Sequence, residues 1–374
     1  MSTGPLKDLR RLVVKIGSAL LVGENNRINR GWLEKLCDDV AALRTSGHQV
    51  LIVSSGAVAL GSEVLGINPR RSRLEELQAA AAAGQVELVQ AYQAALARHT
   101  IKAAQVLLTP DDTEIRRRFL NARGTLEKLI EHEVVPVINE NDTVATDELR
   151  YGDNDRLAAR VAQTVMADGL VLLSDVDGLY SADPRTNKDA EFIPSVRVLS
   201  ERHFEMADDS ASAIGRGGMR TKLQAARIAT RAGCVSIIAN GAVDRPLHAL
   251  ANGGKCTVFE ASATPAAARK QWLAGVLEVC GELRLDAGAA TALANGKSLL
   301  PVGLVEVVGE FRRGDAVVLI GDDGRELGRG LAAYASDEAA AIKGCRSEQI
   351  EARLGYRGRA VVVHRDDMVL FNYE

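Results

Sequence analysis

The chain has few of the residues that mark disulfide-rich or metal-binding proteins. Among 374 residues there are only five cysteines, an odd number, and none of them forms a C-x-x-C pair. The six histidines include no H-E-x-x-H motif. These shortages argue against a disulfide framework and against a zinc site, and they predict no metal held by protein ligands alone. A reducing cytoplasm is the compartment that best fits this use of cysteine.

The chain also lacks a net excess of positive charge and long apolar runs. The formal net charge is −3, with 46 Lys and Arg against 49 Asp and Glu. The chain therefore carries no general excess of positive charge for nucleic acid or an anionic membrane. No apolar run approaches the length of a membrane span, and Met1 to Pro5 do not resemble a signal peptide. We expect a globular protein of the cytoplasm with neither a membrane nor nucleic acid as a partner.

What is present is an alternation of short β-branched runs with longer helical patterns. Helical spacing is clearest in residues 31–43 and 74–98. The runs expected to form strands are residues 12–17, 50–53, 105–108, 134–138, 170–173 and 235–239. Apolar strands separated by helices predict an open αβα sandwich with a mostly parallel sheet covered on both faces. The pattern treats residues 105–108 as the third buried strand of that sheet.

The composition changes near residue 261. Residues 261–272 have little strand character, and the following residues read as short strands separated by glycines. Such spacing is typical of a small β-rich domain. We predict a first domain over residues 1–262, a linker over 263–278 and a second domain over 279–374.

Polar or small residues come directly after five of the predicted strands. In an open parallel sheet, ligands bind beyond the carboxyl ends of the strands. Five such segments would thus share one edge and form one site. They are Lys15-Ile16-Gly17-Ser18, Ser54-Ser55-Gly56-Ala57, Asn139-Glu140-Asn141-Asp142, Ser174-Asp175 and Asn240-Gly241.

A glycine-rich basic segment over residues 215–222 precedes another helical stretch. Glycine lets backbone N–H groups converge on an anion, and a helix N-terminus adds partial positive charge. The segment differs from a Walker A loop, because Thr221 rather than glycine precedes Lys222. A phosphate cradle is one interpretation, and a solvated glycine turn is the alternative. The cradle residues are Arg216, Gly217, Gly218, Met219, Arg220, Thr221 and Lys222.

Two lysines and a carboxylate would suit transfer of a phosphoryl group. Lys15 ends an apolar strand, which is an awkward place for a lysine unless its charge is paired or its stem reaches solvent. With Lys222 it supplies two cations for one phosphoryl group, a reaction that depends on positioning and charge neutralisation. Asp155 could be only a helix cap, but it lies among other carboxylates and amides, including Asp142 and Asn154. A carboxylate acceptor would already be ionised at neutral pH and would need no general base.

At this point an ordered set of motifs resembles the glutamate 5-kinases, a family of the amino acid kinase superfamily. Members make γ-glutamyl phosphate, the first step of proline biosynthesis. The end of the chain, with Ser298-Leu299-Leu300-Pro301 and residues 354–368, is similar to the family's PUA domain. The motifs are Val-Val-Lys-Ile-Gly-Ser (13–18), Val-Ser-Ser-Gly-Ala-Val (53–58), Phe-Leu-Asn-Ala-Arg (119–123), Val-Pro-Val-Ile-Asn-Glu-Asn-Asp (135–142), Gly-Asp-Asn-Asp (152–155), Gly-Leu-Tyr-Ser-Ala-Asp-Pro-Arg (178–185) and Gly-Gly-Met-Arg-Thr-Lys (217–222).

The resemblance implies a role for each matching residue. It implies catalytic roles for Lys15 and Lys222, with Asp155 orienting both lysines. It further implies ATP with Mg²⁺, feedback inhibition by proline and a homo-oligomer. The residues implied to bind glutamate are Ser55, Asp142 and Asn154, and those implied to bind ATP are Lys15, Ser174, Asp175 and residues 216–222.

Three alternatives stay open at this stage. Another superfamily member, such as an acetylglutamate kinase, an aspartokinase or a uridylate kinase, would share the site but act on a different acceptor. An RNA-binding protein could work through the PUA-like tail, but residues 280–374 hold 12 Lys and Arg against 15 Asp and Glu, whereas RNA recognition normally uses a basic surface. A catalytically inactive regulator is disfavoured because Lys15, Lys222 and Asp155 are all present.

Overall fold

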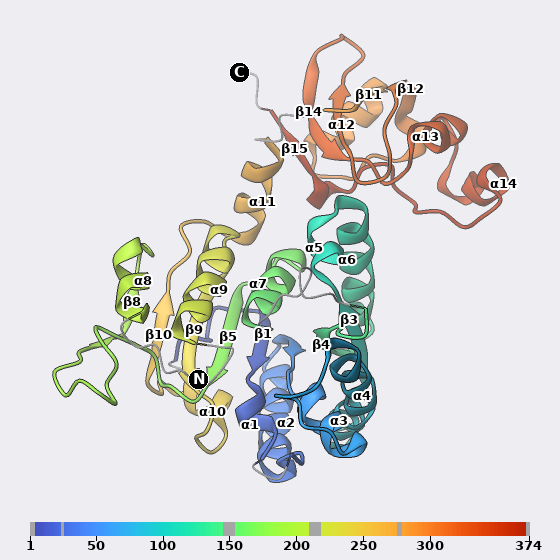
Figure 1. Ribbon diagram of the computed structural model, residues 1–374. Helices are drawn as coiled ribbons and strands as arrows, with labels where there is room; N and C mark the ends of the chain where they lie inside the picture. Colours follow the sequence, from blue (N-terminus) through green and yellow to red (C-terminus); the bar gives the residue numbers. More distant parts are fainter. Residues whose placement is uncertain (1–3, 24–25, 145–153, 209–217, 275–278, 372–374) are drawn as a thin grey trace. The chain divides into compact units, whose positions relative to one another are not determined.

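The computed structural model describes residues 4–23, 26–144, 154–208, 218–274 and 279–371 (Figure 1). The chain divides into two compact units. Unit 1 consists of Met1–Glu114 and Asn121–Pro265, and unit 2 consists of Ile115–Leu120 and Ala266–Glu374. The residues predicted as a linker include a helix, α11 (Pro265–Ala274). The predicted domain limits at residues 262 and 279 stay a prediction.

Unit 1 alternates strands and helices along most of its length. Its described elements, with α6 beginning inside the segment assigned to unit 2, are β1 (Arg11–Ile16), α1 (Ser18–Leu21), α2 (Arg30–Thr45), β2 (Gln49–Val53), α3 (Ala57–Leu65), α4 (Leu74–Ala97), β3 (Ala103–Leu108), α5 (Pro110–Glu114), α6 (Arg116–Glu131), β4 (Val135–Glu140), α7 (Asn154–Thr164), β5 (Gly169–Ser174), β6 (Leu179–Tyr180), β7 (Phe192–Ile193), β8 (Ser195–Val196), α8 (Glu201–Asp208), α9 (Met219–Arg231), β9 (Val235–Asn240), α10 (Pro246–Ala251) and β10 (Cys256–Phe259).

Eight of the ten described strands of unit 1 form a sheet in the order β3-β4-β2-β1-β5-β9-β10-β8, and β6 and β7 form a separate antiparallel pair. Every neighbouring pair is parallel except β9 with β10, which is antiparallel. The prediction of a mostly parallel sheet is confirmed. The prediction that residues 105–108 form a buried strand is wrong, because β3 lies at the edge of the sheet and of its residues only Leu108 is buried. An edge strand has a neighbour on one side only, so its apolar residues can stay partly exposed.

Side chains of β1 alternate between the two faces of the sheet, and each face has its own core. Leu12, Val14 and Ile16 belong to a cluster with α2, α3, α4 and α10. Val13 belongs to the other cluster, with α6, α7, α8 and α9. Because successive strand side chains point to opposite faces, Lys15 lies on the same face as Val13. It therefore faces the side of the sheet covered by α7 and α9.

Helices α3 and α4 approach each other backbone to backbone. A Cβ on Gly61 would lie 1.7 Å from the Ala80 carbonyl oxygen, and one on Gly84 would lie 1.9 Å from the Ala57 carbonyl oxygen. Only glycine allows this separation. At the start of α3, Gly56 has a φ of 103°, a left-handed conformation that lets the chain turn sharply after β2. The contact fixes α4 beside the turn that holds Ser54 and Ser55.

Unit 2 contains a five-stranded sheet in the order β12-β11-β13-β14-β15. The pairing of β11 with β13 is parallel, and the other neighbouring pairs are antiparallel. A separate core that includes Leu283, Leu319 and Val363 confirms the predicted small β-rich domain. Its elements after α11 are β11 (Gly281–Leu285), α12 (Ala287–Ala294), η1 (Pro301–Gly303), β12 (Leu304–Gly309), β13 (Ala316–Ile320), β14 (Glu326–Leu331), α13 (Ser336–Ile342), η2 (Ser347–Gln349), α14 (Ile350–Leu354), η3 (Arg365–Asp367) and β15 (Met368–Leu370).

All five cysteines are free thiols, and Cys37, Cys234 and Cys345 are buried. Among the described helices, none combines the length and the apolar character that crossing a membrane requires.

Candidate active site

Five central strands bring the predicted polar segments to one edge of the sheet. Strands β4, β2, β1, β5 and β9 are consecutive neighbours and all run parallel. Their carboxyl ends therefore meet at the same edge. Asn139 and Glu140 end β4, Ser174 ends β5 and Asn240 ends β9. The expectation that these segments share one edge is confirmed, and the physical reason is the common direction of the strands.

At this edge, two buried lysines share one buried aspartate. The Nζ atom of Lys15 lies 2.5 Å from Oδ1 of Asp155, and the Nζ atom of Lys222 lies 3.3 Å from Oδ2 of the same carboxylate. Asp155 is 0% exposed and each lysine is 5% exposed. The three charges come from β1, α7 and α9, and α7 packs beside α9 (Figure 1). The structure thus brings together all three residues predicted to be catalytic.

The Lys15–Asp155–Lys222 group is costly to bury. A buried ion must be paired, because transfer out of water removes its hydration. One carboxylate pairs with two ammonium groups, so these three side chains together carry one net positive charge. Thr221 adds a hydroxyl oxygen 3.2 Å from Asp155 Oδ2 and 2.8 Å from the Gly218 carbonyl oxygen. The arrangement can stabilise an anion that approaches from the open edge.

Next to this group, side-chain amides form a chain of hydrogen bonds. The Nδ2 group of Asn154 donates to the Ser54 carbonyl oxygen at 2.8 Å, to Ser55 Oγ at 2.8 Å and to Asn139 Oδ1 at 3.0 Å. Asn139 donates in turn from Nδ2 to Gln85 Oε1 at 2.8 Å. Asn154 Oδ1 is buried and has no hydrogen-bond partner among the residues that the structure describes. Since Asn154 and Asp155 are adjacent at the start of α7, one helix end positions both groups.

Gln85 is a site residue that the sequence did not suggest. It lies in the middle of α4, follows Gly84 and is 7% exposed. Its acceptor oxygen determines which end of the Asn139 amide faces Asn154, because an amide presents its donors and its acceptor on opposite sides. A glutamine inside an alanine-rich helix carries no signal of such a role. Only the packing of α4 beneath the β2 turn brings it to Asn139.

The basic glycine-rich segment is described only in part. Gly218 is the N-cap of α9, and Met219 to Lys222 form its first turn. The Gly218 φ is −74°, and a Cβ there would meet nothing within 4 Å, so the fold itself does not require glycine at this position. Met219 packs against the core below α9, and the Arg220 guanidinium carbon lies 5.9 Å from the centre of the Phe204 ring. Arg216 and Gly217 lie outside the described residues.

The remaining predicted residues also lie at this edge. Ser174 is 6% exposed, and its hydroxyl donates to Oδ1 of the exposed Asp175 at 2.9 Å. Asp142 lies two residues beyond the end of β4. The described residues contain no group of three His, Cys, Asp or Glu side chains able to hold a metal ion. The edge therefore offers no metal cage within the described part of the chain.

Strand β1 divides the candidate residues into two sets. The amide-rich set lies beyond β2 and β4 on one side, and the set of Ser174, Asp175 and the start of α9 lies beyond β5 on the other. Lys15 lies between them on β1, paired to Asp155. We refer to these two sets of residues as the two compartments of the site, and the Lys15–Asp155–Lys222 group lies at their junction.

Comparison with known proteins agrees with this description. The model of the amino acid kinase family matches residues 10–240, and that of the PUA domain matches residues 281–354. The chain is 56% identical to a glutamate 5-kinase of Paramagnetospirillum magneticum over 367 aligned residues. The alignment covers 98% of this chain and 99% of that protein. It is 54% identical to a glutamate 5-kinase of Rhizobium rhizogenes, over 98% of this chain and 94% of that protein. For glutamate 5-kinase 1 of Rhizobium meliloti the identity is also 54%, over 98% and 93%.

An open parallel sheet with an ionic site at its carboxyl edge, joined to a small β-rich unit, is the architecture of an amino acid kinase with a PUA domain. Within that class, the identity and coverage of the relatives are decisive. This chain belongs to the glutamate 5-kinase family.

Proposed function

We propose that this chain transfers the γ-phosphoryl group of ATP to the γ-carboxylate of L-glutamate, giving L-glutamyl 5-phosphate and ADP. Family membership supports the reaction, since the relatives are named glutamate 5-kinases. The structural observation that carries the proposal is the buried Lys15–Asp155–Lys222 group at the junction of two compartments. A reaction that joins two substrates needs such a junction. The product is an acyl phosphate, and its formation is the first step of proline biosynthesis.

The two lysines would neutralise negative charge on the phosphate oxygens during the transfer. In phosphoryl transfer, negative charge spreads over the equatorial and bridging oxygens, and catalysis consists mainly of positioning and neutralisation. Lys222, at the start of α9, would meet the nucleotide phosphates, where the helix N-terminus adds positive potential. Lys15, between the compartments, would meet the oxygens of the transferred group. Asp155 holds both ammonium groups in place.

The acceptor needs no general base. A γ-carboxylate has a pKa near 4 and is ionised at neutral pH, so no proton leaves it before attack on phosphorus. No histidine or further carboxylate is required in that role. This chemistry agrees with a site built from ammonium and amide groups.

The amide compartment suits an amino acid. Asn154 uses its donor group within the protein and keeps a buried acceptor oxygen, Oδ1, for which the described residues supply no partner. The ammonium group of an amino acid is a hydrogen-bond donor only, and it could donate a hydrogen bond to Asn154 Oδ1. Ser55 and Asp142 are the further glutamate-binding residues of this proposal.

The nucleotide compartment comprises Ser174, Asp175 and residues 216–222, of which the structure describes 218–222. Mg²⁺ is usually carried by nucleotide phosphates and water with few protein ligands, so the proposal requires no cluster of protein ligands for this ion. When bound, Mg²⁺ supplies charge neutralisation at the β- and γ-phosphate oxygens. Inhibition by proline, assembly of several copies of the chain and a cytoplasmic location complete the proposal, and these rest on the family resemblance alone.

The direct test is formation of an acyl phosphate that is trapped as a hydroxamate by hydroxylamine. We expect product only with ATP and L-glutamate together. N-acetylglutamate, aspartate and UMP are the comparison acceptors. Because phosphorylated UMP gives no hydroxamate, its reaction is measured by the release of ADP. Turnover of any of these in preference to glutamate would assign the chain to a different reaction.

Gln85 gives a prediction specific to the glutamate compartment. Replacing Gln85 with methionine keeps the volume but removes the acceptor for Asn139 Nδ2, so that Asn139 Oδ1, one of the three acceptors of Asn154, is held less firmly. A hydrogen bond of this kind contributes about 1 kcal/mol, so we expect the KM for glutamate to rise roughly fivefold to tenfold. The KM for ATP should stay near its original value.

The matched control is Gln93→Met, the same change at an exposed position of α4. It should alter neither KM. Equal rises of both KM values in Gln85→Met would indicate general damage to the fold and would contradict a positioning role.

A further inference from the structure

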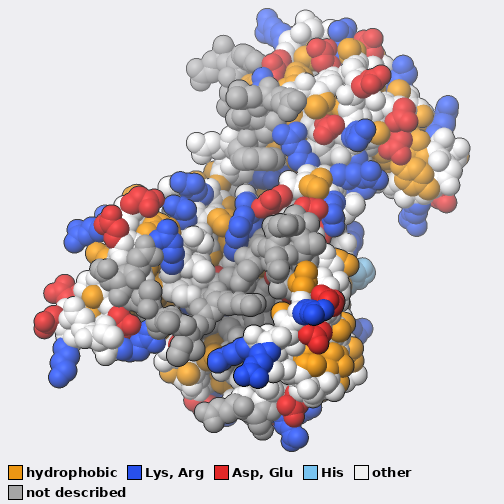
Figure 2. Space-filling model, in the orientation of Figure 1, with side chains coloured by type: hydrophobic (Ala, Val, Ile, Leu, Met, Phe, Trp, Pro, Cys, Tyr) orange, Lys and Arg blue, Asp and Glu red, His pale blue; other side chains and the backbone are white. Residues whose placement is uncertain are grey.

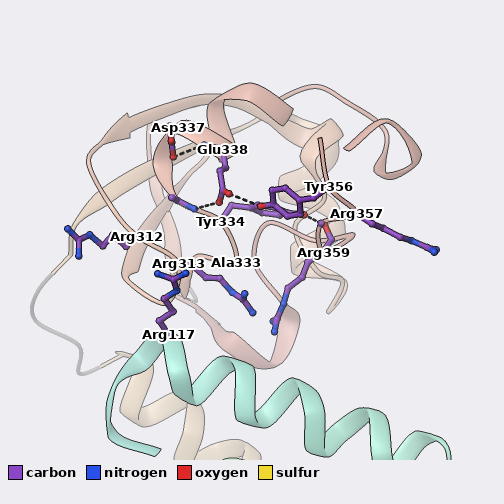
Figure 3. A pocket seen from close by; sticks show the side chains of 12 residues that line it. Arg117, Arg312, Arg313, Ala333, Tyr334, Asp337, Glu338, Tyr356, Arg357 and Arg359 are labelled. Carbon is purple, nitrogen blue, oxygen red and sulfur yellow. Dashed lines mark hydrogen bonds between the residues drawn. The ribbon is translucent and has the colours of Figure 1, made fainter. Parts of the chain in front are cut away.

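Unit 2 contains a cavity of about 540 Å³ that is rich in arginine (Figure 3). Five arginines line it: Arg117, Arg312, Arg313, Arg357 and Arg359. Arg117 is part of Ile115–Leu120, which belongs to unit 2. A cavity of this size lies within the range of small-molecule sites, about 300–1,000 Å³. All its lining residues belong to unit 2, so the cavity is separate from the kinase site of unit 1.

Four of these five arginines have no salt-bridge partner among the residues that the structure describes. In the part of the chain that the structure describes, the side chains of Arg117, Arg312, Arg313 and Arg357 make neither an ion pair nor a hydrogen bond. Four other arginines of unit 2 are paired with carboxylates. These pairs are Arg269 with Asp367, Arg284 with Glu306, Arg325 with Asp323 and Arg329 with Glu326.

Arg313 is the member of the cluster whose guanidinium is least favourably placed. Its Nε atom is buried and has no hydrogen-bond partner among the described residues. Burial lowers the pKa of this guanidinium, and the positive charge of Arg117 lowers it further. Placing like charges together and removing them from water is unfavourable. The cavity lining therefore holds five arginines against two carboxylates, Asp337 and Glu338, and the pKa of Arg313 stays lowered although the negative charge of Glu338 opposes the shift.

The carboxylates beside the cavity are already engaged. Glu338 accepts hydrogen bonds from the Tyr356 hydroxyl at 2.6 Å and from the Ala335 backbone at 3.1 Å. Burial, together with the Glu338 hydrogen bond, raises the pKa of Tyr356 to about 12, so its hydroxyl keeps the proton that it donates. The Tyr334 hydroxyl donates to the Arg359 carbonyl oxygen. In Figure 3, Arg313 and Arg359 extend to the same side of this tyrosine–glutamate group, while Arg312 and Arg357 extend outward at its two ends.

We propose that this cavity binds a small phosphorylated metabolite. A guanidinium presents donors in a planar fork that matches phosphate oxygens, and several unpaired guanidinium groups suit the two charges of a phosphate monoester. A concave site with a local charge cluster favours a small anion over a nucleic acid, which is usually bound by an extended basic surface. Residues 280–374 carry more acidic than basic side chains, and both signs are interspersed over the face shown in Figure 2.

The test is isothermal titration calorimetry of the full-length chain with inorganic pyrophosphate as the probe. All titrations use the Lys222→Ala variant as the background protein, because this substitution is expected to weaken phosphate binding at the proposed kinase site. We expect pyrophosphate to bind this protein at one site per chain. Arg313→Gln and Arg357→Gln, each added to that background, should weaken binding about tenfold or more, as loss of a charge-assisted hydrogen bond does. Because Arg357 is exposed, its variant gives a result even if Arg313→Gln perturbs folding.

The matched control is Arg325→Gln, in the same unit but outside the cavity lining and paired with Asp323. Its pyrophosphate affinity should match that of the background protein. Absence of pyrophosphate binding in the background protein, or binding that neither cavity variant weakens, would overturn the proposal. A ten-nucleotide single-stranded RNA that binds more tightly than pyrophosphate, and depends on Arg313 and Arg357, would overturn it in favour of a nucleic-acid site.

Discussion

Lys222→Ala is expected to lower kcat about 10²–10³-fold, the usual cost of removing one preorganised group that stabilises transition-state charge. The fold should tolerate the change, because Asp155 keeps its ion pair with Lys15 at 2.5 Å. After the substitution the buried group has one charge of each sign. The loss should therefore appear in turnover, while the unfolding transition changes little. Steady-state hydroxamate assays and urea denaturation measure the two effects separately.

Lys35→Ala is the control, since it removes an exposed lysine that pairs with Asp244 at the surface. Exposed pairs of this kind contribute about 0–1 kcal/mol, so activity and stability should both be retained. Full turnover by Lys222→Ala would exclude a role for the start of α9 in holding the transferred phosphate.

Asp155→Ala should lose both stability and activity. The substitution leaves Lys15 and Lys222 buried with no shared carboxylate, and removing one partner of a buried ion pair costs about 3–5 kcal/mol. Activity should fall at least about 10²-fold, because displacement of a catalytic group by about 1 Å has a comparable effect. Urea denaturation of the unliganded protein measures the stability change, and the hydroxamate assay measures the activity.

A second substitution separates the two losses. Adding Lys15→Met to Asp155→Ala removes one of the two buried charges that Asp155 pairs with, so part of the lost stability should return while activity stays low. A double-mutant cycle gives this coupling directly. If Asp155→Ala were as stable as the original chain, then Asp155 would not be the counter-ion that makes burial of both lysines tolerable.

Much of unit 1 can be predicted from local patterns. Runs such as residues 12–16 and 170–173 are continuously apolar because central parallel strands are covered on both faces. That pattern predicted the sheet, and the sheet in turn predicted which polar segments share an edge. The edge strand β3 was misjudged because an apolar run does not reveal how many neighbours a strand has. Its place in the sheet depends on pairing with β4, a contact between separate parts of the chain.

Side chains that act through distant partners could not be predicted. Gln85 takes part in the site only because Gly61 and Gly84 let α3 and α4 touch, which brings α4 beneath the β2 turn. The charge cluster of unit 2 was likewise hidden. Its arginines are scattered through a region whose overall charge is negative, and a net charge does not show where unpaired charges gather.

By itself, the sequence determined the class of fold, the order of its strands along the chain and the identity of the charged residues at their ends. Apolar periodicity and the family motifs are local properties, so they can be read without knowing any contact. The tertiary structure alone decided that Lys15 lies on the α7 face of the sheet, that Lys222 and Lys15 share the two oxygens of Asp155, and that β1 separates two compartments. These features depend on distances between residues far apart in the chain. Electrostatic and hydrogen-bond energies depend on those distances, and folding sets them.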